Sequence, residues 1–219
     1  TSGVTTLYVD GSPAGTSITF SADGSQSHTY YSVDNAGNAE AAHTVTFKID
    51  QTQPTTTLNV TGQAGEAGWY VSPVSASLSA TDAASGVAGT YLNGAPYPGT
   101  WAINAEGDYT YTYYSVDTAG NVETAHTATL HLDLRPPDIS LTASEFHSPS
   151  TISLTATDSR SGVAGGVIGI MDPNWHLIRH WNFTGSQASV VWDGLDEHGQ
   201  PVPTGSFISG PRSRIAPGT

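Results

Sequence analysis

The feature that most constrains the fold is an internal repeat with an offset of 83 residues. The segment TYYSVDNAGN at 29–38 returns as TYYSVDTAGN at 112–121, with a single difference. Of the 22 positions between 29 and 50, 15 are identical to the positions 83 residues later. A repeat of this length predicts similar small domains in tandem rather than one large domain.

A third copy is present in part. LSATD at 78–82 returns as LTATD at 154–158, and SGVAG follows at the same distance in both places. Pro54 and the pair Pro136-Pro137 stand at the joints between copies, where proline favours an extended link. We therefore predict three modules: residues 1–53, 54–135 and 136–219. The first module lacks the strands that should precede it, and the last strand of the third is in doubt.

Within each copy, apolar and polar residues alternate. Between Val74 and Thr81, alanine, valine and leucine occupy every second position, and serine or threonine fills the others. The same period returns at 44–50 and 151–157. A period of two is typical of an antiparallel sheet that is buried on one face only, and no segment has the period of an amphipathic helix. Turn residues recur roughly every 8–12 residues, which predicts an all-β sandwich.

Composition and charge exclude several classes of function. The sequence has no cysteine, which rules out disulfides, thiol nucleophiles and cysteine-bound metals. Nineteen acidic residues against six basic ones give a net charge of −13, which repels phosphate backbones and anionic lipids. We expect neither nucleic acid as a partner nor insertion into a membrane, since no run of about eighteen apolar residues occurs.

The second module resembles a known family of repeats. GWYVSPV at 68–74, ATD at 80–82, SGV at 85–87, YSVD at 114–117 and AGN at 119–121 are similar to bacterial immunoglobulin-like repeats of secreted surface proteins, including repeats of the OmpL47 type. The resemblance implies tandem immunoglobulin-like antiparallel β-sandwich modules. It also implies an extracellular location at the bacterial cell surface.

The third module resembles a different family in its second half. VWDG at 191–194 and VPTGSF at 202–207 are similar to the immunoglobulin-like domain of flagellar hook-capping proteins. That family continues with a final strand, but here the continuation at 208–219 contains two prolines and does not alternate. The resemblance therefore leaves the last strand of this module undecided.

Acidic residues suggest a calcium site where modules join. In an immunoglobulin topology the loops that carry Asp82 and Asp117 lie at the end where the chain enters through Asp50. Carboxylate oxygens suit Ca²⁺, which takes six to eight oxygen ligands. The corresponding acids of the third module are Asp133, Asp138 and Asp158. The alternative is that each aspartate caps its turn by accepting backbone N–H groups.

Aromatic residues suggest a second kind of site. Tyr109, Tyr111 and Tyr113 alternate along one predicted strand, on what we expect to be its outer face, and Trp101 lies nearby in sequence. Such a row would offer a stacking platform to a polysaccharide or a contact for another module. Equally, the tyrosines would stabilise the sheet as cross-strand pairs.

No arrangement of residues indicates catalysis. No serine sits in a Gly-x-Ser-x-Gly elbow, and no two carboxylates are placed as a glycosidase requires. We predict a non-catalytic array, a spacer, stalk or adhesive filament, whose partners are neighbouring modules or copies of the same chain. The alternative is a carbohydrate-binding region of a secreted hydrolase. Calcium is the one cofactor that the residues suggest.

Overall fold

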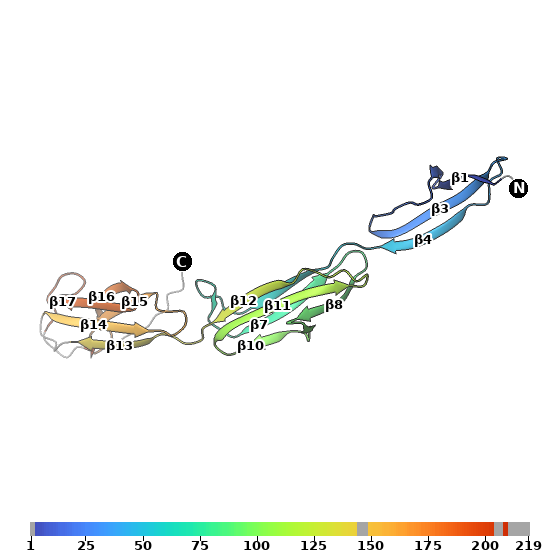
Figure 1. Ribbon diagram of the computed structural model, residues 1–219. Coiled ribbons are helices and arrows are strands. Elements are labelled where there is room, and N and C mark those ends of the chain that lie inside the picture. The colour runs from blue at the N-terminus through green and yellow to red at the C-terminus, as the bar shows by residue number, and fades with distance from the viewer. Residues whose placement is uncertain (1–2, 144–148, 204–207, 210–219) are drawn as a thin grey trace. The chain divides into compact units, whose positions relative to one another are not determined.

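The protein was analysed as a computed structural model, which describes residues 3–143, 149–203 and 208–209. All regular secondary structure in these residues is β-strand, as the alternation predicts (Figure 1). Among them, no helix has the length and apolar character that crossing a bilayer requires. The doubt about the last strand falls on residues 208–219, of which residues 210–219 lie outside the described residues.

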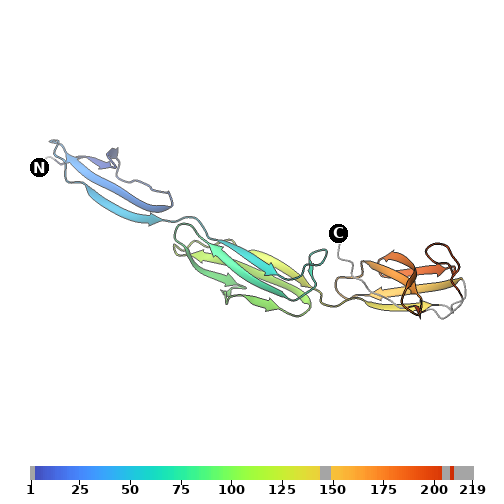
Figure 2. The ribbon, with the colours of Figure 1, turned by 180° about the vertical axis from the view of Figure 1, so that it is seen from behind.

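The first module contains a single antiparallel sheet in the order β2-β1-β3-β4. Its strands are β1 (Val4–Val9), β2 (Ser12–Ala14), β3 (Gly24–Asp34) and β4 (His43–Ile49). The long strands β3 and β4 pair from Gly24 with Ile49 to Tyr30 with His43. Both ribbon views show these strands in blue (Figures 1 and 2).

The second module contains two sheets that face each other. One has the order β10-β7-β5, and the other has the order β6-β12-β11-β8-β9. Strand β7 pairs antiparallel with β5 and β10, and β8 pairs antiparallel with β9 and β11, whereas β6 and β12 are parallel. The strands are β5 (Thr55–Thr61), β6 (Trp69–Tyr70), β7 (Val74–Thr81), β8 (Val87–Leu92), β9 (Ala95–Pro96), β10 (Trp101–Ile103), β11 (Gly107–Asp117) and β12 (His126–Leu132).

The third module also has two sheets, ordered β13-β14-β17 and β16-β15-β18. Its strands are β13 (Asp138–Ala143), β14 (Ser150–Thr157), β15 (Gly165–Met171), β16 (Leu177–Thr184), β17 (Gln187–Trp192) and β18 (Ile208–Ser209). One cluster of buried residues forms the core between the sheets: Ile152, Leu154, Ala156, Ile168, Ile170 and Trp192.

Burial follows the predicted alternation. Val74, Ala76 and Leu78 are buried along β7, and the serines between them are more accessible. In β14 the buried residues are again every second one. At about 25 cal/mol per Å² of apolar surface, each buried leucine or isoleucine contributes roughly 1.5–3 kcal/mol. The fold is therefore an all-β arrangement of antiparallel sheets stabilised by one apolar face per strand.

The chain forms two compact units. One comprises residues 1–61, 74–103 and 109–129, and the other comprises 62–73, 104–108 and 130–219. The described strands pair only with strands of the same predicted module. The boundaries at 53 and 135 nevertheless stay a prediction, and the names of the three modules are kept here for their residue ranges.

One five-residue turn occurs four times among the described residues. Each copy starts at an aspartate, whose backbone N–H donates to the carbonyl four residues on and whose Oδ1 accepts the N–H of that same residue. The aspartates are Asp34, Asp117, Asp172 and Asp196. The fourth residue has a positive φ; it is glycine in three copies and Trp175, at 67°, in the other. Glycine suits this position because positive φ is costly for other residues.

Candidate functional site

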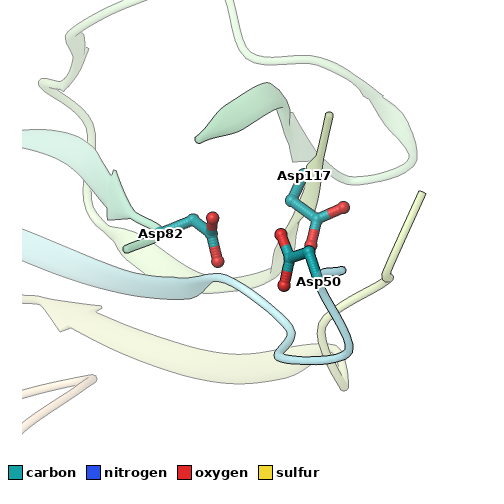
Figure 3. Close-up of side chains that lie close together, drawn as sticks. All are labelled: Asp50, Asp82 and Asp117. Carbon is teal, nitrogen blue, oxygen red and sulfur yellow. The ribbon is translucent and has the colours of Figure 1, made fainter. Parts of the chain in front are cut away.

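Three aspartates from distant parts of the sequence meet at one end of the second module. Asp50 follows β4, Asp82 follows β7, and Asp117 ends β11. One carboxylate oxygen from each lies within 4.8 Å of the other two. Figure 3 shows the three carboxylates turned toward one another. The structure thus brings together the residues that the sequence placed at one end of a sandwich.

Backbone N–H groups occupy several of these carboxylate oxygens. Asp82 Oδ1 accepts hydrogen bonds from the N–H groups of Ala84, Ser85 and Gly86, at 3.1, 3.0 and 2.8 Å. The N–H of Ser85 also donates to Asp50 Oδ2 at 3.0 Å. Asp50 therefore holds the chain that enters the module against the loop that follows β7.

Asp117 is the buried member of the group, with 2% of its surface exposed. Burial raises the pKa of its carboxyl, but hydrogen bonds from the Asn121 side chain and from backbone N–H groups of the turn outweigh this and lower the pKa. Asn121 Nδ2 also donates to the backbone carbonyl of Asp50 at 3.1 Å. The turn that Asp117 begins is therefore tied to the incoming linker as well.

The arrangement supports two chemistries. The hydrogen bonds show that the aspartates cap turns and anchor a linker, which is one of the two roles predicted from the sequence. Three carboxylates within 4.8 Å also repel one another, and a hard divalent cation with oxygen ligands would relieve that repulsion. Calcium binding by Asp50, Asp82 and Asp117 stays a prediction.

The third module repeats part of the arrangement. The N–H of Ser161 donates to Asp133 Oδ2 at 3.0 Å, and Asp158 Oδ1 accepts the N–H of Gly162 at 2.8 Å. Burial raises the pKa of Asp133, but the hydrogen bonds from Ser161 and the charge of Arg160 outweigh burial. The net effect is a lowered pKa. In both linkers, therefore, an aspartate carboxylate accepts the backbone N–H of a serine.

The predicted calcium ligands of the third module do not gather in the same way. In the described part of the chain, the only group of three metal-ligating side chains is the one around Asp50. Asp138 is exposed at the start of β13, where it pairs with Thr157 in the sheet. The sequence placed Asp138 in the linker, and the structure places it in β13 instead. Calcium binding by Asp133, Asp138 and Asp158 stays a prediction.

A buried carboxylate that the sequence did not single out connects both sheets of the second module. Glu123 follows the turn of Asp117, and its side chain is 4% exposed. It accepts hydrogen bonds from the N–H of Thr56 at 2.7 Å, from the hydroxyl of Thr56 at 2.5 Å, and from the N–H of Ser115 at 3.0 Å. His126 Nε2 lies 2.8 Å from Glu123 Oε1, the same oxygen that accepts the N–H of Thr56.

These contacts determine the charge state of Glu123. Burial raises the pKa of the carboxyl, but the hydrogen bonds from Thr56, His126 and Ser115 outweigh burial and lower the pKa. A charged group that is buried with this many donors stabilises the fold only while all of them are present. The repeat could have drawn attention to Glu123, because the equivalent position in the first module is also a glutamate, Glu40.

The predicted row of tyrosines lies elsewhere than expected. Tyr109, Tyr111 and Tyr113 are half-buried and share the face of β11 that carries the buried Ser115. Trp101 of the opposite sheet packs edge-on against Tyr111, with ring centroids 5.2 Å apart. The prediction of an outward platform formed by Tyr109, Tyr111, Tyr113 and Trp101 is corrected accordingly, because Tyr111 packs against Trp101 of the opposite sheet. Tyr113 stacks on His126 of the neighbouring strand, with ring centroids 5.2 Å apart.

Comparison with known proteins identifies no family. No family model matches the chain, and no curated protein sequence matches it. The resemblance to bacterial immunoglobulin-like repeats, and that to hook-capping proteins, thus stay predictions.

Three solved structures are similar to parts of the chain. Dimeric latent PorU from Porphyromonas gingivalis is 13% identical over 89% of this chain and 23% of its own, with a TM-score of 0.29. A tetra-tandem repeat in the extending region of a large adhesion protein is 16% identical over 81% and 50%, with a TM-score of 0.30. Bacteroides ovatus SGBP-B of a mixed-linkage glucan utilization locus, in complex with a mixed-linkage heptasaccharide, is 12% identical over 90% and 61%, with a TM-score of 0.20.

These similarities are weak. The chain spans less than two thirds of each of those solved chains. At such identities and TM-scores they carry no argument about what the chain does.

Proposed function

We propose that this chain is a non-catalytic structural segment of a bacterial surface protein, an array of β-sandwich modules that serves as a spacer, stalk or filament. The observation that carries the proposal is a repeated junction. Asp50 accepts the N–H of Ser85, and Asp133 accepts the N–H of Ser161, each at 3.0 Å. In both places an aspartate just after a module's last strand binds the Ser-Gly-Val loop of the following module.

A junction of this kind suits a load-bearing array. A hydrogen bond from a backbone N–H to a carboxylate is stronger than one between neutral groups. It removes freedom from a linker of only a few residues, and the same bond recurs at the second linker. A chain selected to hold one part of a protein away from another benefits from linkers that are fixed in this way.

The composition supports the rest of the proposal. Solubility here rests on serine, threonine and asparagine with only 11% charged residues, as is common in secreted β proteins. Without cysteine or a serine elbow, the sequence offers no nucleophile in a recognisable setting. We infer an extracellular location and no catalytic activity on these grounds.

The proposal is tested by stretching the chain between two handles in an optical trap. Asp50→Ala and Asp133→Ala together should make the chain more extensible at forces below those that unfold a module. Asp138→Ala is the control for the Asp133 change, because it removes one carboxylate from an exposed position near the linker of Asp133. Equal extension curves for all three chains, or a native chain that offers no resistance to force, would contradict the structural role.

A second candidate function is binding of glycans, and it rests on a residue outside the predicted platform. Trp175 is 57% exposed on the turn that begins at Asp172. Sugars stack on the faces of exposed tryptophan rings. Affinity electrophoresis in gels that contain mixed-linkage β-glucan should then retard the native chain and not Trp175→Ala. Equal mobility of the two chains with and without glucan would remove this candidate.

A further inference from the structure

A cavity of about 520 Å³ lies beside the linker that carries Asp133. Its walls are formed by five residues: Trp69, Asp108, His131, Ser159 and Arg160. All five belong to the second compact unit of the chain, and none takes part in the aspartate cluster or in the contacts of Glu123. The volume falls within the range of roughly 300–1,000 Å³ that is typical of small-molecule sites. It is called the linker cavity below.

One wall of the linker cavity is built on strands of the second module. Trp69 begins β6 and pairs with His131 of β12, and the centroids of their rings lie 5.4 Å apart. His131 Nδ1 lies 2.7 Å from Oδ1 of Asp108, which stands on β11. The imidazole is therefore held between an indole ring and a carboxylate, so its position is fixed before any ligand arrives.

The other wall is the loop that follows β14. The N–H of Ser161 donates to Asp133 Oδ2 at 3.0 Å, two residues after His131 in sequence. That bond brings Ser159 and Arg160, the two residues before Ser161, to the cavity. Both are exposed, so their side chains are accessible to a ligand. The hydrogen bond that anchors the linker thus also completes the cavity.

The first linker has the same hydrogen bond but different residues around it. In the alignment of the repeats, the cavity residues Asp108, His131 and Arg160 correspond to Ser25, Lys48 and Ala84. The bond from the serine N–H to the aspartate forms at both linkers, at 3.0 Å each. It therefore does not depend on the cavity residues. Anchoring of the linker does not explain why a carboxylate, an imidazole and a guanidinium line one cavity here.

The linker cavity combines hydrogen-bonding groups of both charges with one aromatic ring. Asp108 accepts hydrogen bonds, Arg160 donates them, and the hydroxyl of Ser159 does both. The tryptophan presents a broad apolar face beside these groups. The charges of Asp108 and Arg160 offset each other, and the net charge of −13 disfavours an anionic ligand. A neutral sugar ring fits this set of groups, because it carries hydroxyls around its edge and C–H groups on its faces.

We propose that the linker cavity binds one neutral sugar residue of a glycan chain. The sugar ring lies against Trp69, and Asp108, His131 and Arg160 bind its hydroxyl groups. The site is distinct from Trp175, and it adds a binding activity to the structural role of the chain. The extension measurements that test the structural role involve no sugar, so the two proposals can fail separately.

The test is isothermal titration calorimetry of the full chain with cellohexaose, xylohexaose, mannohexaose and maltohexaose, and with hexagalacturonate as an anionic comparison. We expect saturable binding of at least one neutral oligosaccharide at one site, and weaker binding of hexagalacturonate. Trp69→Ala should weaken binding by about tenfold or more, because it removes the stacking surface. Trp175→Ala is the matched control, since it removes an exposed indole that does not line the cavity. It should bind as the native chain does.

A second variant keeps the test valid if Trp69→Ala disturbs the fold. Asp108→Ser, His131→Lys and Arg160→Ala together give the cavity the residues of the first linker, where the anchoring bond is intact. This triple variant should keep the amide NMR spectrum of the native chain outside the cavity. It should also lose sugar binding.

Single substitutions test the polar contacts. Arg160→Ala should weaken binding about tenfold, because it removes a hydrogen bond from a charged donor. Arg135→Ala should not, because Arg135 pairs with Glu106 and does not line the cavity. The proposal would be overturned by failure of all the neutral oligosaccharides to bind, by tighter binding of hexagalacturonate, by unchanged binding in the triple variant, or by equal losses in Trp69→Ala and Trp175→Ala.

Discussion

Glu123→Ala should be among the most destabilising single substitutions in the second module. It would leave the N–H groups of Thr56 and Ser115 without an acceptor between two sheets, and each such buried donor costs about 1–3 kcal/mol. Together with the loss of the contact to His126, this gives a loss of about 3–5 kcal/mol in the free energy of unfolding, as for other broken buried networks. Glu123→Gln should lose less, because its carbonyl oxygen still accepts one of the two N–H groups.

The chain contains its own control for this experiment. Glu40→Ala removes the same group from the equivalent position, but Glu40 is accessible and bonds mainly to Ser32. We expect a much smaller loss for this variant. Hydrogen exchange followed by mass spectrometry reports each module separately, which a single unfolding curve of a multi-module chain does not. Peptides from β11 and β12 should lose protection in Glu123→Ala, and peptides from β3 and β4 should change little in Glu40→Ala. Equal losses in the two modules, or a loss below about 1 kcal/mol for Glu123→Ala, would refute the reasoning.

Three further predictions concern the charge of Glu123, the three clustered aspartates and the residues of positive φ in the aspartate turns. Because the pKa of Glu123 is lowered in the folded chain, its contribution to stability is present above the unfolded-state pKa of about 4.3 and is lost as the pH falls through the folded-state pKa; hydrogen exchange between pH 5 and 3 should show this loss, and Glu123→Gln should not. Millimolar Ca²⁺ should raise the Tm relative to EDTA, by an amount that corresponds to about 2.7 kcal/mol at 100 times Kd, and Asp82→Ala should remove the rise; an equal Tm in both solutions would leave the three aspartates with hydrogen bonding alone. Trp175→Gly should stabilise the third module by about 1 kcal/mol in urea unfolding, because its φ is positive, and Gly120→Ala should destabilise the second by a similar amount; the same sign for both would show that backbone strain does not decide the effect.

Local pattern and topology were enough to predict much of this structure. The alternation along Val74 to Thr81 gave both the strand and its buried face, as the burial of Val74, Ala76 and Leu78 shows. The meeting of Asp50, Asp82 and Asp117 followed from the order of loops in a sandwich. These inferences depend on period and connection, both of which can be read from the sequence.

Other features depend on contacts between distant residues. The alternation of Tyr109, Tyr111 and Tyr113 shows that they share a face but does not show whether that face is buried. In the structure the polar Ser115, in the same row, is buried. That serine is buried because Thr56, which lies 59 residues away in sequence, bonds to it. The turn at Asp172 was missed because Trp175 takes the place of glycine. In this turn the Asp172 carboxylate accepts the N–H of His176, four residues later, as the Asp34 carboxylate accepts that of Asn38.

The four aspartate turns have a kinetic consequence. Each closes its hydrogen bonds within five consecutive residues, so its formation loses little loop entropy and needs no distant contact. At β3 and β4, β11 and β12, and β15 and β16, the turn joins two strands that are neighbours in the same sheet. After unfolding, each of these strand pairs can nucleate at its own turn before the rest of its module assembles. Pairings between strands that are distant in sequence form slowly in all-β proteins. Here they would add to hairpins whose register is already set.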